Sequence, residues 1–224
     1  MNKNYKYSLN ENFFQEINTE EKAYWLGFLM ADGCILDQPQ RSKRLTIALK
    51  KDDISILHKL NSSLESNSKV HECKIKTGKF KDVEYCKLSI SNEKLCQDLI
   101  SLGCTPRKSL TLKFPDIKDE LIHHFIRGYF DGDGSVFTSN EKHHRSKKII
   151  KIIYVDFTGN KEFLESMFNK TNIGTIKCIK KTASQAYNYR VKRNPRCKLF
   201  YEYLYKDANI YLERKKIIFD DYFK

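Results

Sequence analysis

Long apolar runs are missing from the sequence. None of its 224 residues lies in a stretch that approaches the roughly 18 consecutive apolar residues that a membrane helix needs. The first ten residues are polar and aromatic, and they lack the apolar centre of a secretory signal. Hydrophobic residues still make up 40% of the chain, which is enough for the core of one large domain or two small ones. We therefore expect a soluble intracellular protein, from the cytoplasm or nucleoid of a bacterium or phage-infected cell, or from an organelle.

The sequence also lacks pairs of cysteines with the spacing of a metal or disulfide site. The chain has seven cysteines, an odd number, and no two of them are separated by two residues. A scattered set of this kind argues against a disulfide framework and against a zinc site. We predict that all of them are buried, reduced thiols: Cys34, Cys73, Cys86, Cys96, Cys104, Cys178 and Cys197.

Positive charge is in excess, with a formal net charge of +13. A charge of this size on a small protein attracts polyanions and speeds their encounter. Nucleic acid is the partner that it favours. An anionic membrane surface is a weaker alternative, because no single amphipathic helix gathers the lysines and arginines.

A short segment occurs twice, at residues 24–33 and 125–134. Each copy is apolar, contains an internal glycine and ends in Asp-Gly. The matching residues are 101 positions apart: Gly27 and Gly128, Asp32 and Asp133, Gly33 and Gly134. A fixed offset between matched segments indicates an internal duplication.

The sequence around the two copies repeats as well. A helix cap is expected before each, at residues 18–21 and 115–119. After each copy we expect a hairpin, then a helix opened by Asp52 or by Asn160. A second hairpin follows in each half, at residues 70–90 and 176–192. A short helix closes each half, at residues 93–102, ended by Gly103, and at 197–205. We therefore divide the chain into residues 1–113 and 114–224.

The repeated segments are predicted to be two helices that pack closely together. In each, small residues four positions apart share one helix face: Gly27 with Ala31, and Gly128 with Gly132. Such a face lets two helix backbones approach each other. The two helices are therefore expected to lie side by side about a pseudo-twofold axis. We expect the glycines that follow them, at 33 and 134, to end the helices in the left-handed conformation.

This packing would place Asp32 and Asp133 near each other at the ends of the two helices. Helix C-termini carry partial negative charge, so carboxylates there are unfavourable on their own. The free carbonyl groups of Ala31 and Gly132 would add oxygen ligands. A hard divalent cation such as Mg²⁺ would relieve the negative charge, and it could activate water and polarise a phosphodiester.

At these residues the sequence resembles the LAGLIDADG homing endonucleases in their single-chain, two-repeat form. Residues 25–33 and 126–134 match the nine-residue signature, and the resemblance spans nearly the whole chain. It implies an α+β fold of two pseudo-twofold-related αββαββα units, with the signature helices at their interface and antiparallel sheets forming a saddle for DNA. It also implies a monomer that cuts double-stranded DNA at a long, pseudo-asymmetric target and leaves staggered ends. One active-site acid is associated with each strand, and relatives spread mobile introns or inteins.

The resemblance also suggests the metal and the catalytic groups. Asp32 and Asp133 would bind Mg²⁺ or Mn²⁺, and Ca²⁺ is expected to substitute without supporting cleavage. Family members place a basic residue near each metal site, which could stabilise charge on the phosphate. The candidates here are Lys108, Lys215, the adjacent Lys216 and, more weakly, Lys50. The sequence departs from the signature at Trp25, Met30 and Arg127, whereas Asp131 keeps the acid that Met30 replaces.

The hairpins are the expected DNA readers, because a two-stranded ribbon fits the major groove and alternate side chains would face the bases. Many of the polar side chains would contact phosphates only. The candidates lie in four segments: Gln38, Gln40, Arg41, Lys43 and Arg44; Lys74, Lys76, Lys79 and Lys81; Lys142, His143, Arg145 and Lys147; Asn188, Arg190, Lys192 and Arg193.

Two other functions remain open on the sequence alone. One is an RNA-binding intron splicing factor, or maturase, whose partner would be intron RNA. The other is a DNA-binding regulator of the same fold that has lost its activity. Both repeats keep their acid, which favours cleavage, because a binding protein does not need these carboxylates.

Overall fold

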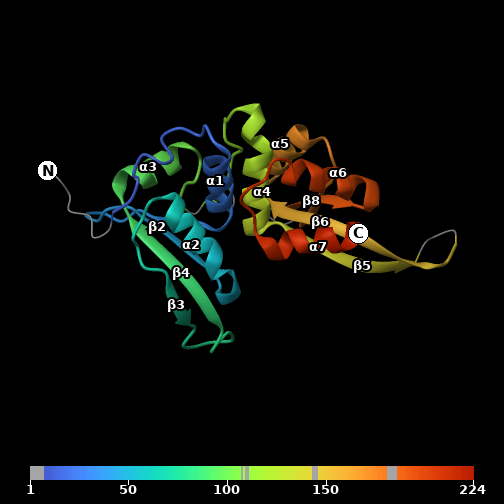
Figure 1. Ribbon diagram of the computed structural model, residues 1–224, viewed down its shortest axis with the longest axis horizontal. Helices are drawn as coiled ribbons and strands as arrows, with labels where there is room; N and C mark the ends of the chain where they lie inside the picture. The colour runs from blue at the N-terminus through green and yellow to red at the C-terminus, as the bar shows by residue number, and fades with distance from the viewer. Residues whose placement is uncertain (1–7, 107, 109–110, 143–145, 181–185) are drawn as a thin grey trace.

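A computed structural model describes residues 8–106, 108, 111–142, 146–180 and 186–224. Two four-stranded antiparallel sheets lie at opposite ends of the molecule, and two helices lie side by side between them (Figure 1). The remaining helices flank the sheets. This is the α+β architecture predicted from the duplicated sequence, with the repeated helices at the interface.

The first half follows the predicted order of helix, hairpin, helix, hairpin, helix. Its elements are α1 (Glu20–Asp32), β1 (Cys34–Leu36), β2 (Arg44–Lys50), η1 (Lys51–Asp53), α2 (Ile54–Ser63), β3 (His71–Lys74), β4 (Glu84–Ser91) and α3 (Glu93–Ser101).

The second half repeats this order and adds a helix. Its elements are η3 (Asp119–Leu121), α4 (Ile122–Asp133), β5 (Ser135–Lys142), β6 (Ile149–Gly159), α5 (Lys161–Thr171), β7 (Thr175–Lys180), β8 (Ala186–Lys192), α6 (Asn194–Tyr205) and α7 (Glu213–Phe223). The sequence did not predict α7. Charged residues make up much of this helix, so its apolar face is small. That face packs through Phe219, which is fully buried against Tyr201 and Phe130.

The two sheets have the same topology, with strand orders β1-β2-β4-β3 and β5-β6-β8-β7. Strand residues alternate between two faces, as they must in a pleated sheet. In β6, Ile153, Val155 and Phe157 are buried in the core beneath the helices. Asp156 lies between them and projects from the other face, which the helices leave open.

The predicted helix caps are only partly confirmed. Thr19 and Asn160 cap α1 and α5 by accepting main-chain hydrogen bonds, and Gly103 follows α3 with a φ of 99°. The predictions at Asp52 and at residues 115–119 were wrong, because α2 and α4 each begin as the continuation of a 3-10 turn. Such a turn already satisfies part of the helix start with main-chain groups.

The close approach of α1 and α4 is confirmed at the predicted glycines. A side-chain carbon added at Gly27 would overlap Phe125 O and lie 2.8 Å from Tyr129 N. One added at Gly128 would overlap Tyr24 O in the reciprocal way. Position 24 matches position 125 at the 101-residue offset, so the contact is self-complementary, as a twofold axis requires.

The left-handed conformation expected at Gly33 and Gly134 was wrong. Their φ angles are −69° and −73°, which is extended backbone that any residue adopts. Glycine is needed there for lack of space instead. A side-chain carbon would lie 2.6 Å from Leu29 O at the first position and 2.8 Å from Phe130 O at the second.

All seven cysteines are free thiols, as predicted, but only four of them are buried: Cys86, Cys96, Cys104 and Cys197. The expectation that every cysteine is buried was therefore wrong, because Cys34 is exposed at the start of β1 and two others are half-buried on outer strands. Among the described residues, no helix has both the length and the apolar character needed to span a membrane.

We expect Gly27→Ala to destabilise the protein by about 3 kcal/mol, the upper end of what extra atoms in a tight interface usually cost. The added methyl group meets main-chain atoms that cannot rotate away. Urea denaturation measures the effect. Gly159→Ala is the matched control, because its nearest neighbour would be Leu164 Cγ at 3.7 Å. Equal stability of the two variants would contradict the packing.

Candidate active site and nucleic-acid interface

Two carboxylates meet where the central helices end. Asp32 is the last residue of α1, and Asp133 is the last residue of α4. The Asp32 side chain reaches across to the other helix, since a side-chain carbon at Gly132 would lie 3.3 Å from its Oδ2 atom. Tyr129 Oη donates a 3.4 Å hydrogen bond to Asp133 Oδ2. The packing of two helices thus produces a cluster of carboxylate oxygens.

The negative charge in this cluster is only partly compensated. Burial first, and then the neighbouring charge of Asp133, raise the pKa of Asp32 to about 6. Burial also raises the pKa of Asp133. Positive charges on Lys215 and Lys108 act in the opposite direction on both groups, and they do not cancel the effect. A further cation would therefore stabilise the ionised pair.

Lys108 and Lys215 occupy related places beside the two carboxylates. Lys108 Nζ donates to Gly33 O, and Lys215 Nζ donates to Gly134 O at 2.5 Å. Lys215 also donates to the carbonyl groups of Phe130 and Asp131, at 2.6 and 2.8 Å. Both lysines thus bind carbonyl groups at the ends of the central helices, where intrahelical donors run out. Burial lowers the pKa of Lys215 to about 8.

The other predicted basic groups lie elsewhere. Lys216 points to the opposite side of α7, where Nζ donates to Asp220 and lies 5.7 Å from the centre of the Tyr201 ring. Lys50 ends β2, where it pairs with Tyr85 of β4. The structure therefore brings Lys108 and Lys215 to the carboxylates, and it does not bring Lys216 there.

The donor set suits a hard divalent cation. Within the described part of the chain, no three histidine, cysteine or acidic side chains form a metal-binding group. Mg²⁺ does not require one, because it keeps several waters and binds one or two carboxylates together with substrate phosphates. Asp32 and Asp133 fit this pattern. Metal binding by the carbonyl groups of Ala31 and Gly132 stays a prediction.

A buried polar network in the second half was missed by the sequence reasoning. Arg127 is fully buried in α4, and its guanidinium group donates to Glu20 of α1 at 2.6 Å. One turn further, Asp131 accepts a 2.9 Å hydrogen bond from Tyr24 of α1. The sequence could have indicated this network, because Arg127 and Asp131 fall in the apolar stripe of the helix and a buried charge needs a partner.

A second missed contact joins the two halves near the carboxylates. Arg214, at the start of α7, forms a two-pronged ion pair with Asp53 of η1, with distances of 2.8 and 2.9 Å. Asp53 is buried, and Arg214 is half-exposed. Arg214 is one position before Lys215, so this pair helps to fix the start of α7 against the first half.

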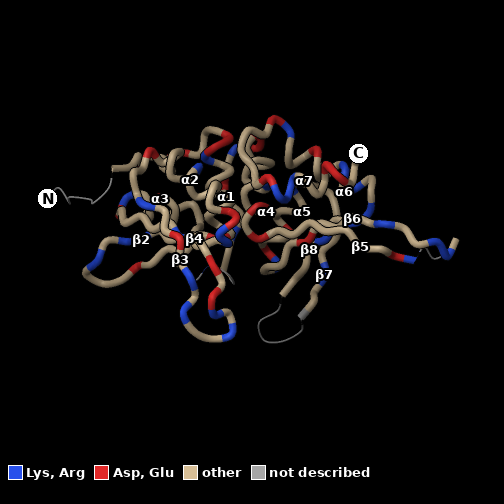
Figure 2. Tube along the Cα trace, turned by 60° about the horizontal axis from the view of Figure 1, so that its bottom comes forward, with Lys and Arg blue, Asp and Glu red and all other residues tan. Residues whose placement is uncertain are grey.

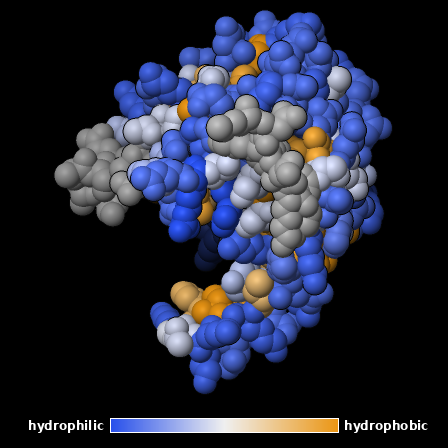
Figure 3. All heavy atoms as spheres, turned by 90° about the vertical axis from the view of Figure 1, so that its left-hand side faces the viewer, coloured by the Kyte–Doolittle hydropathy of each residue, from blue (hydrophilic) through white to orange (hydrophobic). Residues whose placement is uncertain are grey.

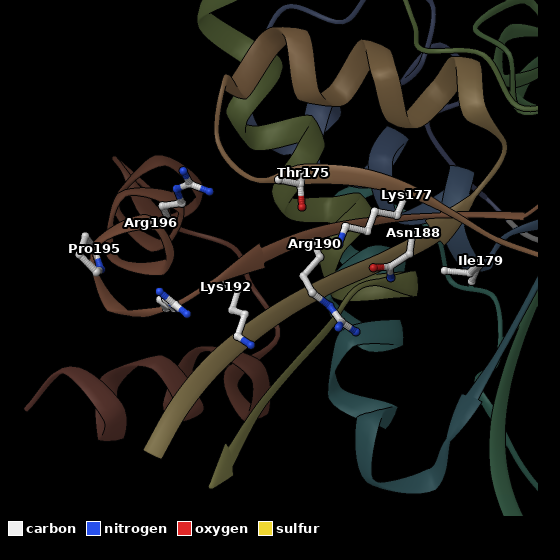
Figure 4. Close-up of a pocket in the computed structure, with 9 residues that line it drawn as sticks. Thr175, Lys177, Ile179, Asn188, Arg190, Lys192, Pro195 and Arg196 are labelled. Atoms are coloured by element: carbon white, nitrogen blue, oxygen red, sulfur yellow. The ribbon is translucent and has the colours of Figure 1, made fainter. Parts of the chain in front are cut away.

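The open faces of the sheets form a concave, polar surface. Figure 3 shows the molecule hollowed on one side, and Figure 2 shows lysine and arginine residues along the loops that extend from both sheets. On the second sheet, a groove of about 730 Å³ is lined by residues of β7, β8 and the start of α6 (Figure 4). They are Thr175, Lys177, Ile179, Asn188, Arg190, Lys192, Arg193, Pro195 and Arg196.

The predicted reader strand β8 alternates as expected. Asn188, Arg190 and Lys192 share the open face, whereas Tyr189 and Val191 between them are buried. Arg190 forms a two-pronged ion pair with Asp156, at 2.7 and 2.5 Å. Lys192 pairs with Glu141 at 2.9 Å. Arg190 and Lys192 are thus held in place by carboxylates. Arg193 follows the strand and is exposed.

The predicted readers of the first sheet are more scattered. Arg44 lies on the open face, where its Nε atom donates to Ser91. Lys43 is turned toward α3, where both its main chain and its side chain bind Glu93. Lys74 pairs with Glu84 at 2.9 Å.

The remaining candidates lie in loops. Exposed positions after β1 hold Gln38, Gln40 and Arg41, and the exposed turn between β3 and β4 holds Lys76, Lys79 and Lys81. Lys142 ends β5, and Lys147 lies just before β6, both exposed; His143 and Arg145 fall outside the described residues. Direct reading of bases by any of these side chains stays a prediction.

Comparison with solved structures finds the same fold in DNA-bound endonucleases. The LAGLIDADG homing endonuclease I-LtrWI bound to target DNA matches with a TM-score of 0.61 at 13% identity, over 92% of this chain and 90% of that one. I-SmaMI bound to cleaved DNA matches with a TM-score of 0.60 at 14% identity, over 92% and 88%. I-AabMI bound to uncleaved DNA matches with a TM-score of 0.61 at 14% identity, over 91% and 88%.

Another structure of I-SmaMI, with a TM-score of 0.56, holds an uncleaved DNA target in the presence of calcium ions. No protein-family profile matches this chain. No curated protein sequence matches it. The chain therefore has the fold of the LAGLIDADG homing endonucleases, as the duplicated signature predicted, at a sequence identity of only 13 to 14% to these structures.

We expect Asp32→Asn to stabilise the protein at pH 7.5 by about 2 kcal/mol when divalent cations are absent. The pKa of Asp32 is raised from 3.8 to about 6, so its ionised form is the destabilised one. The penalty is fully present above pH 6, and it disappears as the pH falls through 6 towards 4.

Urea denaturation at pH 7.5 and at pH 3.5 measures this difference. The stabilisation should be seen at the higher pH only. Asp116→Asn, at an exposed position before α4, should change stability at neither pH. A less stable Asp32→Asn variant at pH 7.5 would show that the carboxylate is not under the electrostatic strain described here.

Proposed function

We propose that this protein is a homing endonuclease that cuts double-stranded DNA at a long, specific site with the help of divalent metal ions. The observation that carries the proposal is the pair of carboxylates at the ends of two tightly packed helices, beneath a concave surface built from two sheets. The shared fold with DNA-bound endonucleases supports the nucleic-acid partner.

Asp32 and Asp133 would hold the metal ions. When bound, Mg²⁺ or Mn²⁺ would supply Lewis acidity for a phosphodiester and an activated water. The protein contributes the binding site itself: the helix packing fixes both carboxylates before DNA arrives, and burial keeps them in an environment where a cation is favoured. Positioning of this kind lowers the cost of ordering the site during the reaction.

Lys108 and Lys215 would add positive charge next to the reacting phosphates. Each is held against the carbonyl group that ends its own repeat's central helix, so neither has to reorganise to face the site. A preorganised cation stabilises charge that develops in a transition state. Two carboxylates and two lysines, related by the pseudo-twofold axis, match the two strands of a duplex, so we propose staggered double-strand cleavage.

The open faces of the sheets would bind the duplex. Their Asn, Arg and Lys side chains can contact base edges in the major groove and phosphates beside it. The two sheets carry different side chains at related places. Thr46 of β2 and Ser89 of β4 share a hydrogen bond of 3.2 Å, whereas the matching strands β6 and β8 have the ion pair of Asp156 with Arg190. The target is therefore proposed to be asymmetric, and one chain suffices to bind both of its halves.

The test is cleavage of a randomised duplex DNA library with Mg²⁺, followed by sequencing of the cut ends. We expect staggered cuts within one long motif, and none when the metal is chelated. Asp32→Asn and Asp133→Asn should each reduce cleavage by about a thousandfold, since a bound metal contributes several kcal/mol to such reactions.

Asp221→Asn is the control, because this exposed carboxylate pairs with Lys224 at the end of α7. It should cut like the unchanged protein, and all three variants should still bind the recovered DNA. Binding to DNA or to a folded intron RNA without any cutting by the unchanged protein would contradict the proposed activity.

Arg190→Ala should weaken binding to the recovered DNA by about 1 to 3 kcal/mol. The change removes a cation from the open face and leaves the carboxylate of Asp156 unpaired beside the phosphates. A fluorescence anisotropy titration at several salt concentrations measures the loss. Lys170→Ala, whose lysine pairs with Asp119 on the helix side, should bind as the unchanged protein does. Equal affinities of both variants would argue against the second sheet as a DNA-binding face.

A further inference from the structure

A buried carboxylate fixes the start of α7. Asp131 is only 1% exposed, and it lies two residues before the proposed metal ligand of α4. Its Oδ2 atom accepts two hydrogen bonds: one of 2.9 Å from Tyr24 Oη of α1, and one of 2.7 Å from the main-chain nitrogen of Leu212. Asp131 therefore joins both central helices to the residue that precedes α7.

The same residues lead directly to Lys215. The carbonyl group of Leu212 accepts a 3.0 Å hydrogen bond from the main-chain nitrogen of Lys215. The side chain of Lys215 then turns back, and Nζ donates to the main-chain carbonyl group of Asp131 at 2.8 Å. These contacts close a ring that begins and ends at Asp131. The place of the Lys215 ammonium group is thus tied to the carboxylate of Asp131.

A second set of contacts holds the connection between α6 and α7 on the same surface. Arg127 Nε donates to Ile210 O at 2.9 Å, and the main-chain nitrogen of Asn209 donates to Glu20 at 2.7 Å. Because Glu20 and Arg127 also bind each other, the connection is docked on both central helices. The approach of α7 is therefore determined by polar contacts, of which those of Asp131 and Arg127 are buried or partly buried.

The surroundings of Lys108 cannot form this arrangement. At the positions related to Asp131 and Tyr24 stand Met30 of α1 and Phe125 of α4, which carry no hydrogen-bonding side-chain groups. In their place, Cys104 Sγ makes a 3.5 Å contact with Leu29 O. The two proposed half-sites share a lysine and an aspartate, but they differ in what holds the lysine.

We propose that Tyr24 and Asp131 are positioning residues for Lys215, so that the cutting of one DNA strand depends on them and the cutting of the other does not. The strand-specific part rests on the proposed endonuclease function. The positioning part concerns only the protein, and it can be measured without DNA.

Two variants copy the residues of the other half: Tyr24→Phe and Asp131→Met. The first removes a single hydroxyl group from a well-packed side chain, so it keeps the test valid if the second does not fold. Tyr201→Phe is the matched control. It removes a 2.7 Å hydrogen bond from a tyrosine to an aspartate that also holds α7, but at Asp220, far from the start of the helix.

The first measurement is the rate at which acetic anhydride modifies Lys215, followed by peptide mass spectrometry with Lys94 as internal reference. Lys215 is 5% exposed in the intact protein. We expect its rate to rise by about tenfold in Tyr24→Phe and in Asp131→Met, the usual scale for loss of a buried hydrogen bond, and to stay unchanged in Tyr201→Phe. An unchanged rate in a folded Tyr24→Phe variant overturns the proposal.

The second measurement follows a supercoiled plasmid that carries the recovered target. Tyr24→Phe should accumulate nicked circles, with end-labelling showing that the same strand is always cut, whereas Tyr201→Phe should linearise the plasmid directly. Equal slowing of both strands overturns the strand-specific part. If the unchanged protein cuts no DNA, the proposed function fails, while the modification rate still decides whether Tyr24 and Asp131 position Lys215.

Discussion

The contact between α1 and α4 is the constraint on which the rest of the molecule depends. Gly27 and Gly128 have no side chain because each faces main-chain atoms of the opposite helix. This approach sets the pseudo-twofold axis, and the axis sets the positions of both sheets. It also forces two aspartates together at the negative ends of two helices, which is the least favourable place for them. The proposed active site is a direct result of this packing.

The two halves compensate for that charge in different ways. In both, a lysine binds the carbonyl group that ends the central helix, next to the aspartate. Among the described residues, the lysine of the second half has further buried partners, the main-chain carbonyl groups of Phe130 and Asp131 in the helix itself. A duplicated protein with an asymmetric target has no need for equal halves. The buried polar residues are thus a difference between the second repeat and the first.

The sequence was sufficient to predict the duplication, the element order and the proximity of Asp32 to Asp133, because these depend on local patterns that occur twice. It did not predict α7, whose stability comes from tertiary contacts of Phe219 rather than from a strong apolar stripe. It predicted the wrong conformation for Gly33. Glycine is required both where space is short and where φ is positive, so the sequence alone does not distinguish the two causes. It treated Lys215 and Lys216 alike, although adjacent helix residues point to different sides.

The most direct test of the account is the position of the metal ions in crystals of the protein with its recovered DNA target and Mn²⁺. Anomalous scattering locates manganese without relying on activity. The account predicts density in contact with the carboxylates of both Asp32 and Asp133, with the DNA phosphates beside it and the Lys108 and Lys215 ammonium groups next to the cluster. Manganese bound elsewhere, with these two carboxylates facing only protein or solvent, would contradict it.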